Sequence, residues 1–438
     1  MRVIKEQQLK AFMESLRERA SVYSKKGSVQ DAVQKIIDDV RQNGDKAVKK
    51  YTEKFDSIKL KSLLITQKEL ESSAWKAGRE FLSALNIAAK RIRAFHKYQK
   101  EKSWQFTKDG ITLGQIIRPI ERVGVYVPGG KASYPSTVLM NVIPAQVAGV
   151  REIALCVPTP QGGINPAVAA AIRLLGIKEV YRIGGAQAIA ALAYGTKTIK
   201  KVDKIVGPGN VYVAAAKRLV FGDVDIDMIA GPSEILIIAD KTANPSFIAA
   251  DLLGQAEHDE MASSILVTDS ESLAKKVGQE IYIQLKNLKR KAIAKKSLDK
   301  YGAIIITKDL NDAIELANQA APEHLEIMTK SPARFLPKIK NAGAIFLGEW
   351  TPETLGDYAA GPNHTLPTSG TARFSSPLGV YDFIKRSSLL GFKKEGFMKL
   401  AGIVETLADT EGLEAHGNTI RVRMRRGESV KIVNSRCW

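Results

Sequence analysis

Short β-like runs alternate with helical stretches through the middle of this chain, and this alternation restricts the fold more than any other feature. Four such runs occupy 123–127, 152–157, 179–183 and 202–206, at a fairly even spacing. Between them, Asn165-Pro166 is typical of a helix start and Leu175-Gly176 of a helix stop. Strands that alternate with helices form βαβ units with right-handed crossovers, so the sequence predicts a parallel sheet.

The same alternation resumes further along the chain and predicts a second α/β sheet. Its β-like runs occupy 234–239, 263–268, 303–307, 324–328 and 343–348. The first hundred residues have helical patterning, with a capping box at Thr66 and Glu69. Asp109-Gly110 lies between two β-like runs and predicts a hairpin. The stretch from Lys385 is short, basic and glycine-containing, and we interpret it as an arm.

Composition indicates a globular protein of a reducing compartment. Among 438 residues, 45% are apolar and 25% are charged, and no apolar run approaches the roughly 20 residues of a membrane helix. The N-terminus lacks the apolar core of a signal peptide. The two cysteines, Cys156 in an apolar run and Cys437 near the end, have no metal-ligand spacing. We therefore expect a cytoplasmic protein with no membrane partner.

The net charge of +19 raises the possibility of a nucleic-acid partner. The positive residues are dispersed, however, and the densest groups, at 286–296 and 421–426, contain no interleaved aromatic residues. Binding driven by phosphate contacts usually needs a clustered basic face. We therefore interpret the charge as a solvated, Lys-rich surface and expect no nucleic-acid partner.

Glycine-rich turns follow several of the predicted strands. They lie at 126–130, 184–187, 207–210 and 230–233. Open α/β sheets bind ligands at the carboxyl ends of their strands, where glycine lets the backbone approach a phosphate. Any one of these turns is equally consistent with a tight connection that binds nothing, and the G-x-G-x-x-G fingerprint is absent. Together the four turns favour a ligand crevice.

Four of the five histidines fall after residue 250, each near acidic or amide residues, while His96 lies in a helical stretch where we expect a surface position. A lone histidine is more often structural than a ligand. Imidazole and carboxylate together are the ligands of a borderline divalent metal such as zinc. The residues alone predict a metal site built from His258, His364, His416 and Asp357, and an acid/base pair at Glu323-His324.

A set of segments, in order along essentially the whole chain, resembles the histidinol dehydrogenase family closely. The matching segments are YVPGG, GGAQAIAALAYGT, KVDKIVGPGNVYV, DIDMIAGPSEILIIAD, DLLGQAEHDEMASSILVT, APEHLEIM, GDYAAGPNHTLPTSGTARF and EGLEAHGNTIRVR. The resemblance implies oxidation of L-histidinol to L-histidine in two steps, with two NAD and one zinc per subunit. It also implies an intertwined homodimer.

The fold implied by the resemblance is α/β, with two incomplete Rossmann-like domains. We place an N-terminal helical segment at 1–25 and a C-terminal arm at 385–438. The first Rossmann-like domain, on the substrate and zinc side, joins 26–122 to 236–384. The second, on the NAD side, spans 123–235.

The resemblance also assigns roles to individual residues. The zinc ligands are Gln255, His258, Asp357 and His416, so Gln255 replaces His364 in the set above and leaves His364 without an assigned role. The catalytic pair is Glu323 and His324. The substrate meets Ser233, His324, Glu411 and the zinc ligands, and NAD contacts Tyr126, Gln187 and Asn210. In the family, Glu411 and His416 come from the partner's arm.

Neither cysteine has an activating context, so the aldehyde intermediate must be attacked by water and not by a thiolate. In the mechanism we expect, His324 accepts the alcohol proton and assists the second oxidation, while Glu323 activates the water.

Two alternatives stay open. Relatives with this fold oxidise other small alcohols, such as a sulfonated propanediol, although Glu411 and His416 suit an amine and an imidazole better than a sulfonate. The other alternative is a non-catalytic paralogue, but the intact Glu323-His324 pair and the complete ligand set argue against it. The Gln/His/Asp/His set is also compatible with manganese or cobalt.

Overall fold

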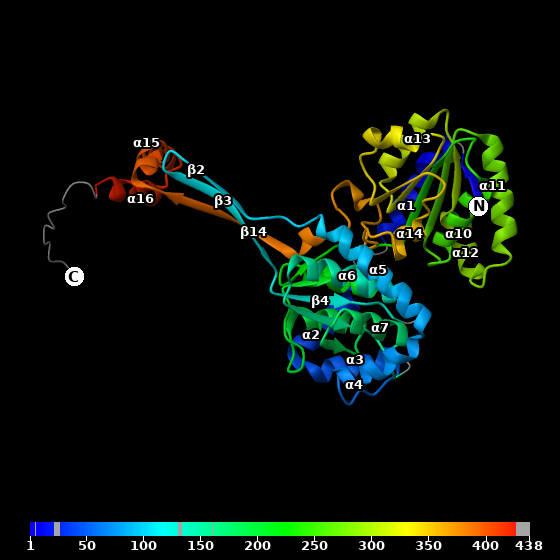
Figure 1. The fold of residues 1–438 in the computed structure, drawn as a ribbon, viewed down its shortest axis with the longest axis horizontal. Coiled ribbons are helices and arrows are strands. Elements are labelled where there is room, and N and C mark those ends of the chain that lie inside the picture. The colour runs from blue at the N-terminus through cyan, green and yellow to red at the C-terminus, as the bar shows by residue number, and fades with distance from the viewer. Residues whose placement is uncertain (5, 22–26, 130–133, 161, 426–438) are drawn as a thin grey trace. The chain divides into compact units, whose positions relative to one another are not determined.

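The computed structural model describes residues 1–4, 6–21, 27–129, 134–160 and 162–425. The chain divides into two compact units (Figure 1). The large unit comprises Met1–Lys100 and Pro119–Phe383, and the small unit comprises Glu101–Arg118 and the chain from Ile384 onward. None of the described helices is long and apolar enough to cross a membrane.

A five-stranded parallel sheet forms one half of the large unit, as the alternation predicts. Its strands are β4 (Arg122–Tyr126), β5 (Glu152–Cys156), β6 (Glu179–Tyr181), β7 (Lys204–Val206) and β8 (Asp225–Ile226), in the order β6-β5-β4-β7-β8. The chain builds outward from β4 on one side and then from β7 on the other. The strand order therefore reverses between β4 and β7, as it does in Rossmann folds.

The helices between these strands begin where the sequence indicates. They are α6 (Pro135–Ala148), α7 (Pro166–Leu174), α8 (Gly185–Tyr194) and α9 (Val211–Val220). Asn165 caps α7 by accepting hydrogen bonds from Ala167 and Val168, with Pro166 in the first turn. Asn210 caps α9 in the same way. The helix start predicted at Asn165-Pro166 is thus confirmed.

A six-stranded parallel sheet forms the other half of the large unit. Its strands are β1 (Arg2–Ile4), β9 (Glu234–Ala239), β10 (Ser263–Thr268), β11 (Ala303–Ile306), β12 (His324–Met328) and β13 (Ala344–Leu347), in the order β1-β11-β10-β9-β12-β13. Here the order reverses between β9 and β12. The second predicted sheet is therefore confirmed.

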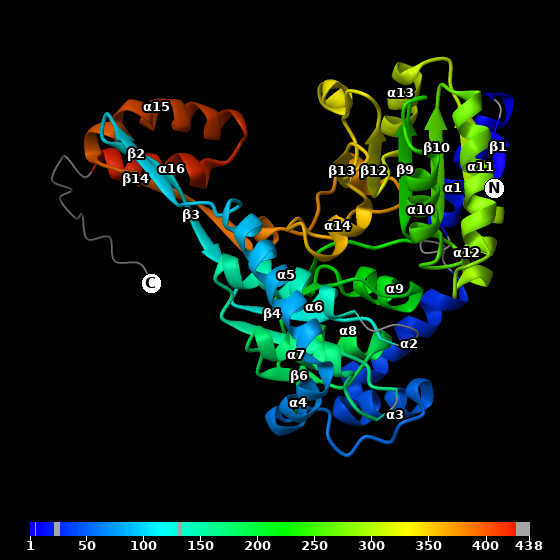
Figure 2. The same cartoon turned by 45° about the vertical axis from the view of Figure 1, so that its right-hand side comes forward.

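Both faces of the six-stranded sheet are covered by helices, which are α1 (Glu6–Ser21), α10 (Pro245–Ala256), α11 (Glu271–Leu285), α12 (Lys291–Tyr301) and α13 (Leu310–Ala320) (Figure 2). The short helix α14 (Glu353–Tyr358) contacts β12 through Glu326. Ile235 and Ile237 of β9 pack in one core with residues of α10, α11 and α12. Leu236 and Ile238 point to the opposite face and pack with residues of α1 and α13. Side chains alternate between faces along a strand, so a continuous apolar run fits a sheet buried on both sides.

The first hundred residues pack differently from the expected division. The helices α2 (Ser28–Asn43), α3 (Asp45–Asp56), α4 (Gln67–Ala74) and α5 (Arg79–Lys97) contribute to the two cores of the five-stranded sheet. The predicted domain that joins 26–122 to 236–384 is therefore wrong for these helices, because they pack with the five-stranded sheet. β1 pairs with β11, so residues before 22 belong to the six-stranded sheet instead of forming a separate segment.

Local predictions in the same region are mostly confirmed. The Thr66 side chain accepts a hydrogen bond from the backbone N–H of Glu69, as expected of a cap. His96 is an exception: it is fully buried on α5, and its Nδ1 lies 2.8 Å from the carbonyl oxygen of Ile92. Cys156 is buried on β5, as expected.

The small unit joins the predicted arm to the predicted hairpin. β2 (Trp104–Lys108) and β3 (Ile111–Pro119) are antiparallel and turn at Asp109 and Gly110, both with positive φ. This geometry confirms the Asp-Gly hairpin. β14 (Ile384–Phe392) adds to β3, and α15 (Lys394–Thr410) and α16 (Glu414–Arg425) follow. The prediction of an arm at 385–438 therefore left out the β2–β3 hairpin, which belongs to the same unit.

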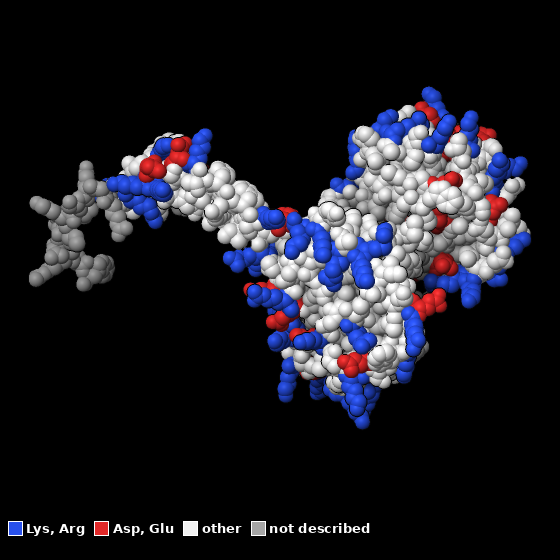
Figure 3. Space-filling model, viewed as in Figure 1, with Lys and Arg blue, Asp and Glu red and all other residues white. Residues whose placement is uncertain are grey.

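Lysine and arginine side chains are scattered over the face drawn in Figure 3, with acidic side chains among them. This distribution agrees with the dispersed charge expected from the sequence.

Candidate active site

The Glu323-His324 pair lies at the amino end of the six-stranded sheet. Glu323 precedes β12 and His324 is its first residue, in register with Ile235 of β9 and Ala344 of β13. In a βαβ unit the helix returns toward the edge where its strand began, so α10 carries Gln255 and His258 back to this end. The expectation that ligand sites follow the carboxyl ends of strands is therefore wrong for this sheet.

The main chain of Glu234, the first residue of β9, holds both members of the pair. Its N–H donates to Oε2 of Glu323 at 2.9 Å, and its carbonyl oxygen lies 3.0 Å from Nδ1 of His324. A carbonyl can only accept, so Nδ1 carries the proton and Nε2 is left as the acceptor. Nε2 has no hydrogen-bond partner among the described residues. It can therefore accept a proton from a substrate whenever the ring is neutral.

Three carboxyl groups surround the buried His324 ring. Nδ1 lies 3.7 Å from Glu323 and 3.9 Å from Glu353, and Nε2 lies 3.7 Å from Oδ1 of Asp357. Burial acts to lower the pKa of His324, but these three carboxylates outweigh it and raise that pKa well above 6.5. The site thus carries an excess of acidic groups that a cation would balance.

The carboxyl groups respond to the same environment in different ways. Burial raises the pKa of Glu323 to about 8, with His324 and the Glu234 N–H opposing it. Burial likewise raises the pKa of Glu353 to about 7. Burial also acts to raise the pKa of Asp357, but His324 outweighs it and holds that pKa below its usual range. Asp357 is therefore an anionic donor, while Glu323 titrates near neutral pH, where a general base works best.

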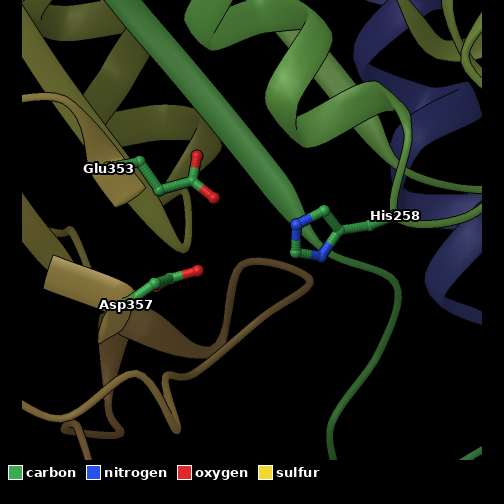
Figure 4. Close-up of side chains that lie close together, drawn as sticks. All are labelled: His258, Glu353 and Asp357. Atoms are coloured by element: carbon green, nitrogen blue, oxygen red, sulfur yellow. The ribbon is translucent and has the colours of Figure 1, made fainter. Parts of the chain in front are cut away.

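His258, Glu353 and Asp357 form a group of potential metal ligands (Figure 4). One nitrogen of His258 and one oxygen of each acid lie within 4.8 Å of one another. His258 is exposed, yet desolvation by the surrounding atoms lowers its pKa, which keeps the ring neutral and able to bind a metal. The carboxylates of Glu353 and Asp357 point toward its ring (Figure 4).

Gln255 is a further potential ligand beside this group, and Glu353 is a member of the group that the sequence analysis did not identify. Gln255 is buried on α10, and both of its side-chain polar atoms lack partners among the described residues. Buried amides are normally hydrogen-bonded, so unpaired atoms indicate a missing ligand or ion. Glu353 was not predicted from the sequence, although its spacing of four residues from Asp357 places both on one helix face.

Glu326 is a second residue that sequence reasoning missed. It is buried in the middle of β12, and its Oε1 accepts the backbone N–H of Glu353 at 2.7 Å. A carboxyl group at the first turn of a helix stabilises the exposed N–H groups there. Glu326 thereby fixes the start of α14, whose last turn carries Asp357.

The remaining predicted site residues divide between the two units. Ser233 immediately precedes Glu234 at the amino end of β9. His364 lies in the same site, because Asp357, His324 and His258 all act on its pKa, which burial lowers. Glu411 ends α15 and His416 lies on α16, both exposed in the small unit.

The residues expected to contact NAD line one cavity of about 720 Å³ beside the five-stranded sheet. Tyr126 ends β4, Gln187 lies on α8 and Asn210 caps α9. The cavity therefore lies at the carboxyl ends of these strands, at the reversal between β4 and β7. The Tyr126 hydroxyl accepts the backbone N–H of Gly185 at 3.1 Å, which fixes the ring against the start of α8.

Comparisons with known proteins bear directly on this pair of sites. The family model described as histidinol dehydrogenase matches residues 19–424. The chain belongs to the histidinol dehydrogenase family. A histidinol dehydrogenase of Aquifex aeolicus is 55% identical over 415 residues, covering 93% of this chain and 96% of that protein. One of Syntrophotalea carbinolica is 53% identical over 400 residues, covering 91% of this chain and 93% of that protein.

The structural comparison gives the same family. The crystal structure of histidinol dehydrogenase from Elizabethkingia anophelis superposes with a TM-score of 0.92 at 39% identity, covering 98% of this chain and 99% of that chain. The match to the histidinol dehydrogenase family model includes the five-stranded sheet, the six-stranded sheet except β1, the Glu323-His324 pair, the cavity residues and most of the small unit.

Proposed function

We propose that this chain oxidises L-histidinol to L-histidine through a bound aldehyde in cytoplasmic histidine biosynthesis, with NAD as the oxidant and zinc as the metal. The proposal rests on one observation: the pair suited to proton transfer, Glu323-His324, lies in the same site as the potential metal ligands His258 and Asp357. The overall reaction converts the alcohol, one water and two NAD⁺ to the carboxylate, two NADH and three protons. We propose no nucleic-acid or membrane partner.

The donors of the site fit a divalent metal such as zinc. His258 offers a neutral imidazole, Asp357 an anionic oxygen and Gln255 an unpaired buried amide. From the family resemblance, His416 completes the set. When bound, zinc supplies a point that orients the amine and imidazole nitrogens of the substrate.

The chain's own residues then account for the proton transfers. Nε2 of His324 accepts the hydroxyl proton as the first hydride leaves the alcohol carbon. Glu323, with a pKa near neutral, accepts a proton from the water that adds to the aldehyde. As the water adds, His324 returns its proton to the aldehyde oxygen, and it then accepts the hydrate's hydroxyl proton as the second hydride leaves. The excess of acidic groups around His324 requires a cationic partner before its Nε2 can act as a base.

A cysteine nucleophile is not part of this proposal. Cys156 is buried on β5 of the five-stranded sheet, and burial raises the pKa of its thiol. A thiol with a raised pKa forms little thiolate and reacts poorly. Cys437 lies outside the described residues. The attack on the aldehyde is therefore assigned to water.

We assign NAD to the cavity lined by Tyr126, Gln187 and Asn210. It lies where open α/β sheets bind their ligands, at the point where strand order reverses. The amino ends of α8 and α9 also reach it, and their N–H groups suit the diphosphate.

A homodimer with shared sites is the second part of the proposal. The small unit exposes many large apolar side chains, which are Trp104, Phe106, Leu390, Phe392, Met398, Leu400, Ile403, Val404, Leu407, Leu413 and Val422. So many exposed apolar side chains in a unit of this size favour association with another chain. From the family resemblance, the partner's Glu411 and His416 complete each site.

Mixed dimers test whether the sites are shared. We expect Glu323→Gln and His416→Ala chains alone to form NADH only slowly after the first turnover, and to regain steady-state activity when mixed, because one site in each mixed dimer is then wild type. The measurement is histidinol-dependent NADH formation after dissociation and reassociation, with each variant treated alone as the control. No recovery from dimers that have demonstrably exchanged would contradict sharing.

A substrate comparison tests the proposed function itself. We expect kcat/KM for L-histidinol to exceed that for a sulfonated propanediol by at least about 10³-fold, because a site built for cationic and imidazole nitrogens leaves its acidic groups unpaired with a sulfonate. NADH formation with each alcohol gives the ratio. A preference for the sulfonated alcohol would move the assignment to the other relatives of this fold.

A further inference from the structure

We infer that Arg19 of α1 is a positioning residue for the proton-transfer pair: it anchors Glu234, whose main chain holds both Glu323 and His324. The inference rests on the proposed function, since the pair is assigned its role there. Arg19 lies far from Glu323 and His324 in the sequence and hydrogen-bonds neither of them. Its effect on the reaction must therefore pass through Glu234.

Glu234 holds the pair from one peptide unit on each side of its Cα. Its N–H binds Oε2 of Glu323 at 2.9 Å and its carbonyl oxygen binds Nδ1 of His324 at 3.0 Å. The two groups therefore share one support. A shift or rotation of Glu234 would move the N–H that binds Glu323 and the carbonyl oxygen that binds His324 together. A misplacement of about 1 Å can cost roughly 10²-fold in rate.

Arg19 fixes the side chain of Glu234. The Arg19 side chain is fully buried, and its Nη2 forms an ion pair with Oε1 of Glu234. Its Nη1 donates to the carbonyl oxygen of Met261 at 2.7 Å, and its guanidinium lies 5.5 Å from the centroid of the Tyr301 ring. Without the guanidinium, the buried Glu234 carboxylate would lose its ion-pair partner, and it would protonate or move.

The metal donors keep supports of their own if Arg19 is lost, although Arg19 also contacts the turn that follows His258, through the carbonyl oxygen of Met261. Asp357 lies on α14, whose start is fixed by Glu326. His258 precedes a turn closed by Asp259, whose Oδ1 accepts the N–H of Met261 at 2.9 Å and whose carbonyl accepts the N–H of Ala262 at 3.0 Å. Loss of Arg19 should therefore disturb proton transfer more than metal or substrate binding.

The test compares Arg19→Met and Arg19→Lys with Arg122→Met as the matched control. Arg122 is also a buried arginine, paired with Glu152 and Glu179 at 2.6 Å each, but at the amino end of β4, opposite the cavity. Steady-state kcat, KM for histidinol, zinc content and melting temperature are measured for each, with assays well below every melting temperature. Glu234→Gln replaces Arg19→Met if the latter does not fold.

We expect Arg19→Met to lower kcat by about 10- to 100-fold, with KM changed less than about threefold and zinc retained. Arg19→Lys keeps the charge and should recover most of the loss. Arg122→Met should lose thermal stability yet keep kcat within about twofold. A folded Arg19→Met with unchanged kcat, equal losses in Arg19→Met and Arg122→Met, or zinc lost in step with activity would each overturn the inference.

A spectroscopic readout keeps this test independent of the proposed function. In ¹⁵N NMR of the full chain, the protonated, hydrogen-bonded Nδ1 of His324, assigned by its loss in His324→Gln, should shift in Arg19→Met and remain unchanged in Arg122→Met. If the wild-type chain forms no NADH with histidinol but this shift is seen, the proposed function fails and the positioning role stands. An unchanged His324 signal would contradict the positioning role.

Discussion

In Glu323→Gln, oxidation of the aldehyde is expected to fall by about 10²- to 10⁴-fold, while oxidation of the alcohol falls by less than about tenfold. The amide keeps the shape of the side chain and an oxygen that accepts the Glu234 N–H, but it takes no proton from water. The first oxidation depends on His324, which the substitution leaves in place. Aldehyde oxidation is measured with L-histidinal supplied directly, and alcohol oxidation as the first NADH of a single turnover.

Glu315→Gln is the matched control for this experiment. Glu315 lies exposed on α13, the helix that precedes the pair, so the same chemical change there should leave both half-reactions unaltered. An equal loss of the two half-reactions in Glu323→Gln would show that Glu323 does not serve the hydration step in particular.

Removal of a metal donor should abolish both half-reactions together. We expect His258→Ala and Asp357→Ala each to weaken zinc binding by at least about 100-fold, since changes in residues that merely support ligands already cost 10- to 100-fold. Activity should fall in proportion to bound metal. Zinc per subunit is measured by mass spectrometry after dialysis against a buffer of fixed free zinc, and the rates are measured on the same samples.

Asp299→Ala provides the comparison for the metal experiment. Asp299 is an exposed carboxylate paired with Lys295 on α12, and its loss should change neither zinc content nor rate. Variants of His258 and Asp357 that retain zinc at the wild-type level would exclude these residues as ligands. Full activity in a zinc-free variant would exclude a role for the metal.

The sequence predicts the two sheets well because the positions of strands and helices follow from the local pattern. The run 234–239 is short and apolar after its first residue, as a strand buried on both faces requires. Caps at Thr66 and Asn165 and the turn at Asp109-Gly110 depend on neighbouring residues alone, so they too can be read locally.

Packing between distant segments is where the sequence is less informative. An amphipathic helix shows that one face is buried, but not which sheet covers it, so α2–α5 were assigned to the wrong sheet. The hairpin of 104–119 and the strand from Ile384 likewise combine through pairing that neither segment indicates alone. His96 was placed at the surface because its charged neighbours obscure the buried face of α5.

The candidate site divides in the same way between motif and geometry. Glu323-His324 and the His258 and Asp357 donors follow from residue type and family resemblance. Glu353 and Glu326 do not, since a carboxylate gains a role there only through contact with α14 and β12. The position of the site at the amino end of the six-stranded sheet follows from the path of α10, which a list of motifs does not contain.

The most direct test of the central assignment is the number of NADH formed per L-histidinol consumed by the purified chain, with and without a zinc chelator. The account predicts two NADH per histidinol, loss of the reaction on chelation and recovery when zinc is restored. One NADH per histidinol would mean that the aldehyde is released and that Glu323 does not activate water for a second oxidation. No NADH from folded, zinc-loaded protein would contradict the assignment of histidinol as the substrate.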